Sequence, residues 1–237
     1  MFLSKRTKFF LGHLGCSLLI ALAIISVVFF VWFPTPLANA EGVTRIFWML
    51  LIIDVILGPL LTLLVYKEGK KTLKMDLCII ILLQIIALVY GLYNIAQSRP
   101  VWIVQKGSIF QLVRANSMDP LDQKDADSKY NHNGWLKPQW VTLDIDHPKF
   151  DNFLEPTTIP YFYTNLNNAT KRIQRNSESL DTLNTFNDPK KVKTILKQYP
   201  AATAWMPLRT TGLGCVVLIN ANNGEIVKVV DLRPWKE

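Results

Sequence analysis

The polar residues best placed to do chemistry in this sequence lie inside an apolar segment. Within the run from Ile46 to Tyr66, the stretch DVILGPLLTLLVY holds one carboxylate, Asp54, followed four residues later by Gly58 and Pro59. Placing a carboxylate at the centre of a membrane helix costs about 2.5 to 3.5 kcal/mol, so Asp54 should be neutral, hydrogen-bonded or turned toward protein. Pro59 has no amide hydrogen, and in an α-helix it leaves the carbonyl of Val55 without a partner. Asp54 and that carbonyl together predict a polar notch on a kinked helix.

The side chains that could fill this notch follow from their depth in the membrane. At about 1.5 Å per residue, Asp54 lies roughly 12 Å below the outer end of its segment, level with Ser26 and Tyr90 of the other two apolar segments, and Gln84 lies about 7 Å deeper. A hydrogen bond from Ser26 or Tyr90 to Asp54 would hold three helices together. Alternatively, the notch accepts a transmembrane helix of another protein, and the binding residues are then expected to be Asp54, Gly58, Pro59, Leu61, Thr62, Gln84 and Tyr90.

Patterns of catalytic and metal-binding residues are absent from the sequence. The three histidines, at positions 13, 132 and 147, belong to no HExxH or paired arrangement, and the three cysteines, at 16, 78 and 215, form no CxxC pair. There is no G-x-S-x-G motif and no glycine-rich phosphate loop. The sequence therefore predicts a protein that is not an enzyme and that uses no metal and no cofactor.

Three apolar segments must position these residues. They run from Phe9 to Phe33, from Ile46 to Tyr66 and from Leu77 to Ala96, and each is long enough for a helix that crosses about 30 Å of hydrocarbon. Lys and Arg gather before the first segment and between the second and third, whereas the loop between the first two holds only Arg45. By the positive-inside rule the N-terminus is cytoplasmic and the chain after Gln97 is outside. We therefore expect a membrane domain over residues 1–97 and an exported domain over residues 98–237.

The small residues Ala38 and Ala40, just before Glu41, leave a second interpretation of the first segment open, because signal peptidase cleaves after such a pair. The apolar run is about 25 residues, longer than the roughly 7 to 15 of a signal peptide, which favours an uncleaved helix. Cleavage would leave two membrane helices and the same exported domain.

The net charge of +8 is shared equally between the two parts. Up to residue 97 the chain has eight Lys and Arg against four Asp and Glu, which gives +4 and leaves +4 for the exported part. Such a mildly basic domain lacks the electrostatic pattern of a nucleic-acid-binding protein, so no nucleic acid partner is expected.

The exported part has the pattern of a small α+β domain. Runs of β-branched and aromatic residues predict strands at 101–105, 109–115, 140–146, 215–221 and 225–232, with a hairpin turn at 222–224. Asp188 and Pro189 open a helix that Pro200 ends. We therefore predict a small antiparallel sheet with one or two helices. Four residues are candidates for binding a partner, with packing at the end of the sheet as the alternative: Trp205, Pro207, Arg233 and Trp235.

Several stretches resemble the type IV pilin accessory proteins, namely WFPTPLANAEG, DVILGPLLTLLVYKEGKKTLKMDL, QIIALVYG, SRPVWIV and the final DLRPW. The most specific pattern is Asp-x-x-x-Gly-Pro-x-Leu-Thr, formed here by Asp54, Gly58, Pro59, Leu61 and Thr62. The resemblance covers nearly the whole chain and is strongest in the membrane half.

This resemblance implies a chaperone-like accessory protein in the inner membrane of a Gram-negative bacterium, with the exported domain in the periplasm. Such a protein binds and stabilises its cognate type IV major pilin in the membrane and promotes pilus assembly without catalysis. The implied partners are the pilin, inner-membrane lipid and other pilus assembly proteins. The alternative is a ligand-binding sensor or scaffold subunit of an envelope secretion or pilus machine, which a well-formed polar pocket among the strands would favour.

Overall fold

The chain folds as two units. The computed structural model describes residues 4–118, 123–132 and 134–236 of the 237 residues. The helical unit combines Met1–Phe30 with Val43–Ala96, and the sheet unit combines Val31–Gly42 with Gln97–Glu237. The sequence predicted one boundary near residue 97. Instead, the segment 31–42 between the first two long helices groups with the C-terminal part of the chain.

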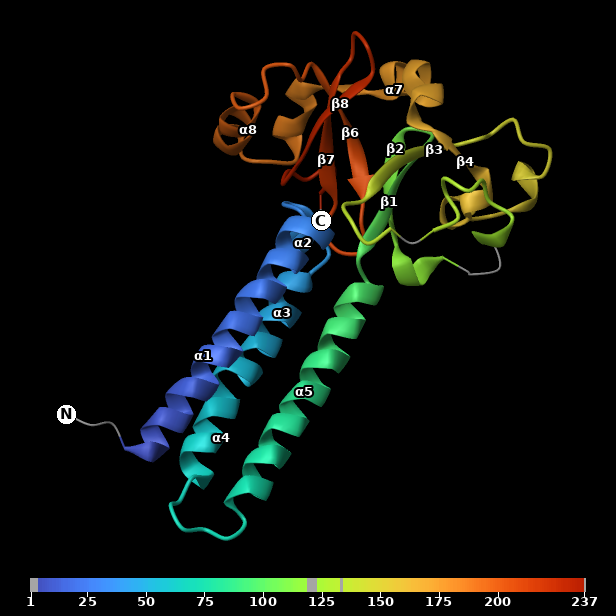
Figure 1. Cartoon of the computed structure of the whole chain (residues 1–237). Coiled ribbons are helices and arrows are strands. Elements are labelled where there is room, and N and C mark those ends of the chain that lie inside the picture. The colour runs from blue at the N-terminus through green and yellow to red at the C-terminus, as the bar shows by residue number, and fades with distance from the viewer. Residues whose placement is uncertain (1–3, 119–122, 133, 237) are drawn as a thin grey trace. The chain divides into compact units, whose positions relative to one another are not determined.

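The helical unit contains three helices that are long and apolar enough to cross a membrane, counted within the described residues. The first consists of α1 (Lys5–Ser26) and the π-helical turn η1 (Val27–Trp32), the second of α3 (Val43–Ile52), the π-helical turn η2 (Ile53–Leu57) and α4 (Gly58–Val65), and the third of α5 (Leu73–Gln97) (Figure 1). The prediction of three such helices is confirmed. The second helix begins three residues before the predicted Ile46, so Asp54 lies about 4.5 Å farther from its outer end than predicted.

The sheet unit contains one mixed sheet, in which eight described strands follow the order β4-β3-β1-β2-β6-β7-β8, with β5 paired to β6 (Figure 1). The strands are β1 (Pro100–Lys106), β2 (Ile109–Arg114), β3 (Gln139–Leu143), β4 (Tyr163–Asn165), β5 (Glu178–Ser179), β6 (Ala204–Arg209), β7 (Cys215–Asn220) and β8 (Glu225–Val230), and the main helices are α7 (Thr170–Asn176), η8 (Leu180–Thr185) and α8 (Pro189–Leu196).

The predicted α+β class is confirmed, and most neighbouring strands are antiparallel as expected. The pairs β1 with β3 and β2 with β6 are parallel. Parallel pairing needs a long connection that returns the chain in the same direction, and strand patterns in a sequence do not reveal the path of such a connection.

Both faces of the sheet are covered. On the first face, Met206 and Val217 pack in a cluster with Ile173 of α7. On the second face, Trp205 and Leu218 pack in a cluster with residues of η8 and α8. Because successive residues of a strand point to opposite faces, the neighbouring pairs 205–206 and 217–218 divide between the two clusters.

The segment 31–42 contributes to the core of the first face. Its short helix α2 (Leu37–Ala40) buries Leu37 and Ala40 in the same cluster as Met206. The carbonyl of Ala40 accepts a hydrogen bond from the N–H of Leu213 at 2.9 Å. A Cβ atom on Gly212 would lie 2.3 Å from that carbonyl, so only glycine permits this close approach.

Glu41, directly after α2, fixes the end of the segment. Its side chain is 1% exposed and forms an ion pair with Arg114 of β2. Thr211 donates to the same carboxylate from its N–H at 3.1 Å and from its hydroxyl at 2.8 Å. The peptide bond between Ala40 and Glu41 therefore lies within folded structure, next to the loop before β7.

Candidate functional site

The polar groups of the second long helix are paired differently from the predicted notch. In η2 the hydrogen bonds run to the carbonyl five residues back, as from the N–H of Gly58 to the carbonyl of Ile53. Pro59 therefore leaves the carbonyl of Asp54 without its helical donor, where the α-helical prediction had named Val55. Gln84 of α5 supplies the missing donor, since its Nε2 lies 3.1 Å from the Asp54 carbonyl oxygen.

Two glycines allow the second and third helices to approach each other. A Cβ atom on Gly58 would lie 1.9 Å from Nε2 of Gln84, and one on Gly91 would lie 2.2 Å from Cδ1 of Leu50. Each glycine thus receives a side chain from the other helix, as small residues do at helix contacts in membranes. Sequence reasoning identified Gly58 through its place beside Pro59 and missed Gly91, for which the spacing of small residues was the available signal.

The carboxylate of Asp54 is buried and unpaired. The residue is 8% exposed, and neither carboxylate oxygen has a hydrogen-bond partner among the described residues, nor does Oε1 of Gln84. The two predicted internal partners are wrong: the hydroxyl of Ser26 donates to the carbonyl of Leu22 at 2.9 Å, and Tyr90 is 70% exposed. Depth along a helix does not fix the face on which a residue lies, and the depth count had no information on rotation.

The unpaired oxygens belong to residues that line a cavity of about 790 Å³. All three long helices contribute to its wall, which is largely apolar and includes Ile20 of α1 together with Ile81 and Ile85 of α5. Asp54 and Gln84 lie among these apolar side chains. The three unpaired oxygens themselves have almost no accessible surface, so they lie beneath the apolar wall of the cavity.

His13 is a polar residue of this cavity that was not among the predicted notch residues. Its Nδ1 lies 2.7 Å from the hydroxyl oxygen of Thr62, and both residues line the cavity. The contact arises because α1 packs against α4, and a lone histidine in an apolar helix gave no indication of its neighbour.

The predicted notch residues divide into three groups. Asp54, Thr62 and Gln84 line the cavity, whereas Gly58 and Pro59 are buried and determine the local backbone. Leu61 and Tyr90 are exposed and are not part of the cavity wall within the described residues. Among those residues there is also no group of three or more His, Cys, Asp or Glu side chains that could hold a metal ion.

Two of the residues predicted to bind a partner on the sheet unit are structural. Trp205 is 1% exposed, and its indole N–H lies within hydrogen-bond distance of the carbonyl of Ser179 and the hydroxyl of Thr182. The expectation that Trp205 is available to a partner is therefore wrong. Pro207 lies within β6 opposite Val216 of β7 and is half-buried.

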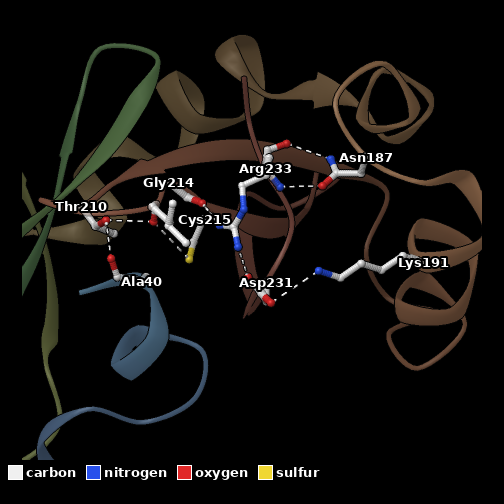
Figure 2. Close-up of polar contacts among 9 residues, drawn as sticks. Ala40, Asn187, Lys191, Thr210, Gly214, Cys215, Asp231 and Arg233 are labelled. Atoms are coloured by element: carbon white, nitrogen blue, oxygen red, sulfur yellow. Dashed lines mark hydrogen bonds and ion pairs between the residues drawn. The ribbon is translucent and has the colours of Figure 1, made fainter. Parts of the chain in front are cut away.

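Arg233 joins the C-terminal segment to the rest of the sheet unit (Figure 2). Its guanidinium contacts the Asp231 carboxylate and the carbonyl of Gly214, while its backbone exchanges hydrogen bonds of 2.7 and 2.8 Å with the side chain of Asn187. Cys215 lies buried nearby, and burial raises the pKa of its thiol to about 11. Among the four candidates, Trp235 retains the most exposure, and its ring lies against Gly214.

A second hollow lies in the sheet unit, and we call it the β8 groove. It has a volume of about 730 Å³ and is lined by Leu37 of α2, Ile103 of β1, Trp140 of β3, residues of α7 and the continuous stretch 223–229. Residues from distant strands of the sheet order thus face one hollow, which means that the sheet curls around it.

Comparison with known proteins places the chain among proteins of fimbria assembly. Residues 2–42 match the family described as fimbrial assembly protein FimB. This range contains α1, η1 and α2. The fimbrial assembly protein of serogroups C1 and C2 from Dichelobacter nodosus is 37% identical over 94 residues, which are 39% of this chain and 72% of that protein.

The fimbrial assembly proteins of serogroups E1 and I from the same organism are 38% and 37% identical over 94 residues. The chain spans 37% of the length of each of these two relatives. No solved structure matches the chain significantly. With identity of this level across most of the C1 and C2 relative, the chain belongs to the fimbrial assembly protein FimB family.

Proposed function

We propose that this chain is an accessory protein of pilus assembly that binds the apolar helix of a type IV pilin subunit in the inner membrane and stabilises the subunit until it is assembled. The names of the relatives support a role in fimbria assembly. The observation that carries the helix-binding proposal is the cavity among the three long helices, which is lined by the buried and unpaired carboxylate of Asp54.

A transmembrane helix is the occupant that best suits this cavity. Helices associate in membranes through close packing and hydrogen bonds, because lipid tails are as apolar as the side chains they replace. The apolar wall with Ile20, Ile81 and Ile85 offers packing, and the buried acceptors of Asp54 and Gln84 would offer hydrogen bonds to a donor that displaces the side chains over them. A donor on the incoming helix would offset part of the roughly 2.5 to 3.5 kcal/mol that an unpartnered carboxylate costs in hydrocarbon.

The proposed orientation follows from charge. Lys and Arg precede α1 and are frequent in the loop between α4 and α5. The N-terminus and this loop are therefore cytoplasmic in the proposed orientation, and the sheet unit is periplasmic. A pilin subunit in the membrane has an apolar helix and an exported globular head. The helical unit would then bind the helix, and the sheet unit would contact the head. The proposed role is non-catalytic, and the inner-membrane lipid is the solvent in which it takes place.

Site-specific photo-crosslinking in cells that carry the neighbouring pilin gene tests this role. A photo-reactive residue at Ile85, in the cavity wall, should give an adduct with the mass of this chain plus pilin. The same residue at Leu64, which is 72% exposed and lies outside the cavity wall among the described residues, is the matched control and should give mainly lipid adducts.

Replacement of Asp54 tests the contribution of the cavity to pilin binding. Asp54→Leu removes the acceptor and should lower both the Ile85 adduct and the steady-state level of pilin, whereas Asp54→Asn keeps an acceptor oxygen and should retain more of each. Adducts of equal yield at Ile85 and Leu64, or an unchanged pilin level in Asp54→Leu, would count against the helix-binding role.

A further inference from the structure

One edge of the sheet lies open along the β8 groove. Among the described strands, β8 is the last in the sheet order and pairs only with β7. Every residue from 223 to 229 lines the groove. Successive side chains of a strand point to opposite faces, so a wall that includes the consecutive residues 225–229 of β8 is formed by its backbone edge rather than by one face.

The register identifies the backbone groups that point outward. The N–H of Thr203, just before β6, donates to the carbonyl of Ile219 at 2.9 Å, so the polar backbone groups of Ile219 face β6. In an antiparallel pair the residue opposite such a position turns its own groups away. Ile226 lies opposite Ile219, Lys228 opposite Leu218 and Val229 opposite Val217, so the register shifts and Val227 is an extra residue, as in a β-bulge. Because of this extra residue, Ile226 and Val229 both lie opposite positions that face β6, although they are three residues apart. The N–H and C=O groups of Ile226 and Val229 therefore point away from β7, on the side of the groove.

The walls of the groove suit a chain with alternating side chains. Ile226 and Val229 pack on the first face of the sheet, together with Trp140 and the buried Leu37 and Ile103. A strand added beside β8 would direct every second side chain onto this apolar wall and the others away from it. A small ligand would use side-chain groups, whereas the outward main-chain donors and acceptors of a strand edge match the backbone of an extended peptide.

We infer that the open edge of β8 binds an extended segment of the fimbrial subunit as an additional strand. The segment would alternate apolar and polar residues and form main-chain hydrogen bonds with Ile226 and Val229. The identity of the partner rests on the proposed function, whereas the site and its preference for an extended peptide rest on the sheet alone. Strand addition at β8 would give the chain a second contact with the fimbrial subunit, separate from the helix-binding cavity.

Amide hydrogen exchange at single-residue resolution tests this inference on the full chain in detergent micelles. In the free chain, the N–H groups of Ile226 and Val229 should exchange quickly, while those of Lys228 and Val230, which face β7, should exchange slowly. Two probes are added separately, the purified fimbrial subunit and a set of short peptides that tile its sequence. Binding at the edge should slow exchange at Ile226 and Val229 at least about tenfold, as expected for newly bonded amides.

A matched pair of variants isolates the backbone contribution. Val229→Pro removes the outward N–H and is compatible with an edge strand, whereas Val229→Ala removes most of the same side chain but keeps the N–H. The proline variant should bind the probe about tenfold more weakly than the alanine variant, since one main-chain hydrogen bond is lost. Equal affinities of the two variants would contradict strand addition.

The outcomes separate this inference from the proposed function. Protection of Ile226 and Val229 by a peptide supports strand addition even if crosslinks at Ile85 fail. If the subunit is crosslinked at Ile85 but neither probe protects these amides, the helix-binding role stands and strand addition is overturned. Protection that rises with the concentration of the chain itself, without a probe, would assign the edge to a second copy and would also overturn the inference.

Discussion

A substitution of the buried Glu41 tests whether the segment 31–42, between the first two long helices, contributes to the stability of the sheet unit. The change Glu41→Ala removes the partner of Arg114 and the acceptor for both donors of Thr211. If residues 31–42 are part of the sheet unit, this substitution in the connection between two membrane helices should destabilise a sheet formed almost entirely by residues after Pro100.

The expected magnitude follows from burial. Breaking a fully buried ion pair by removing one partner costs about 3 to 5 kcal/mol. The Glu41 side chain is 1% exposed, but that of Arg114 is 24% exposed, so water recovers part of the solvation of the guanidinium. We therefore expect a loss of about 2 to 4 kcal/mol in the free energy of unfolding. For a domain of this size, that corresponds to a decrease in melting temperature of about 5 to 15 °C.

The assay is thermal unfolding of the full chain in detergent, followed by tryptophan fluorescence. Glu155→Ala is the matched control, because Glu155 is 71% exposed and lies 3.9 Å from Lys106. Exposed pairs of this kind contribute about 0 to 1 kcal/mol. If the two variants melt at the same temperature, the segment 31–42 does not unfold together with the sheet and the reasoning fails.

Three other changes test single contacts. Gly58→Val should displace Gln84 from the Asp54 carbonyl and lower the stability of the helical unit by about 1 to 2 kcal/mol, measured by unfolding in the same detergent; an unchanged value would show that this interhelical bond contributes nothing. Trp205→Phe keeps an aromatic ring in the core but loses the indole donor and part of the ring volume, and should lower the free energy of unfolding in urea by at least about 1 to 2 kcal/mol. Because burial raises the pKa of Cys215 to about 11, alkylation of this thiol in the folded chain should be at least about a hundredfold slower than in urea. Since the unfolded thiol loses its proton first, stability should also fall as the pH rises from about 9 to about 11, and Cys215→Ala should abolish that part of the slope.

The elements that could be predicted from the sequence are those fixed by length and local chemistry. Three apolar segments were sufficient to predict the long helices, since the thickness of a bilayer sets the required length. The final hairpin formed as expected, with Gly224 at a φ of 72° in the turn. Asp188 caps α8 by accepting a hydrogen bond from the N–H of Lys190 at 2.9 Å.

The parts that could not be predicted depend on rotation and on distant contacts. Gln84, and not Tyr90, donates a hydrogen bond to the backbone carbonyl of Asp54. Packing around Gly58 and Gly91 determines which face of each helix contacts the other. From residue 204 to residue 208 every residue is apolar, so the sequence there has no alternation of apolar and polar residues from which a buried face could be recognised. The place of α2 in the core required knowledge of β6 and β7, which lie far along the chain.

The attachment of Ala40 and Glu41 to the loop before β7 has a consequence for the order of events during synthesis. Their partners Thr210 and Thr211 lie 170 residues farther along the chain. At about 5 to 20 residues per second, translation needs roughly 10 to 30 s to supply them. During this interval the Ala-Asn-Ala stretch has left the ribosome but has no core to bury it. The contacts that bury Ala40 and Glu41 therefore form late, and this part of the core is completed only when translation has reached the loop before β7.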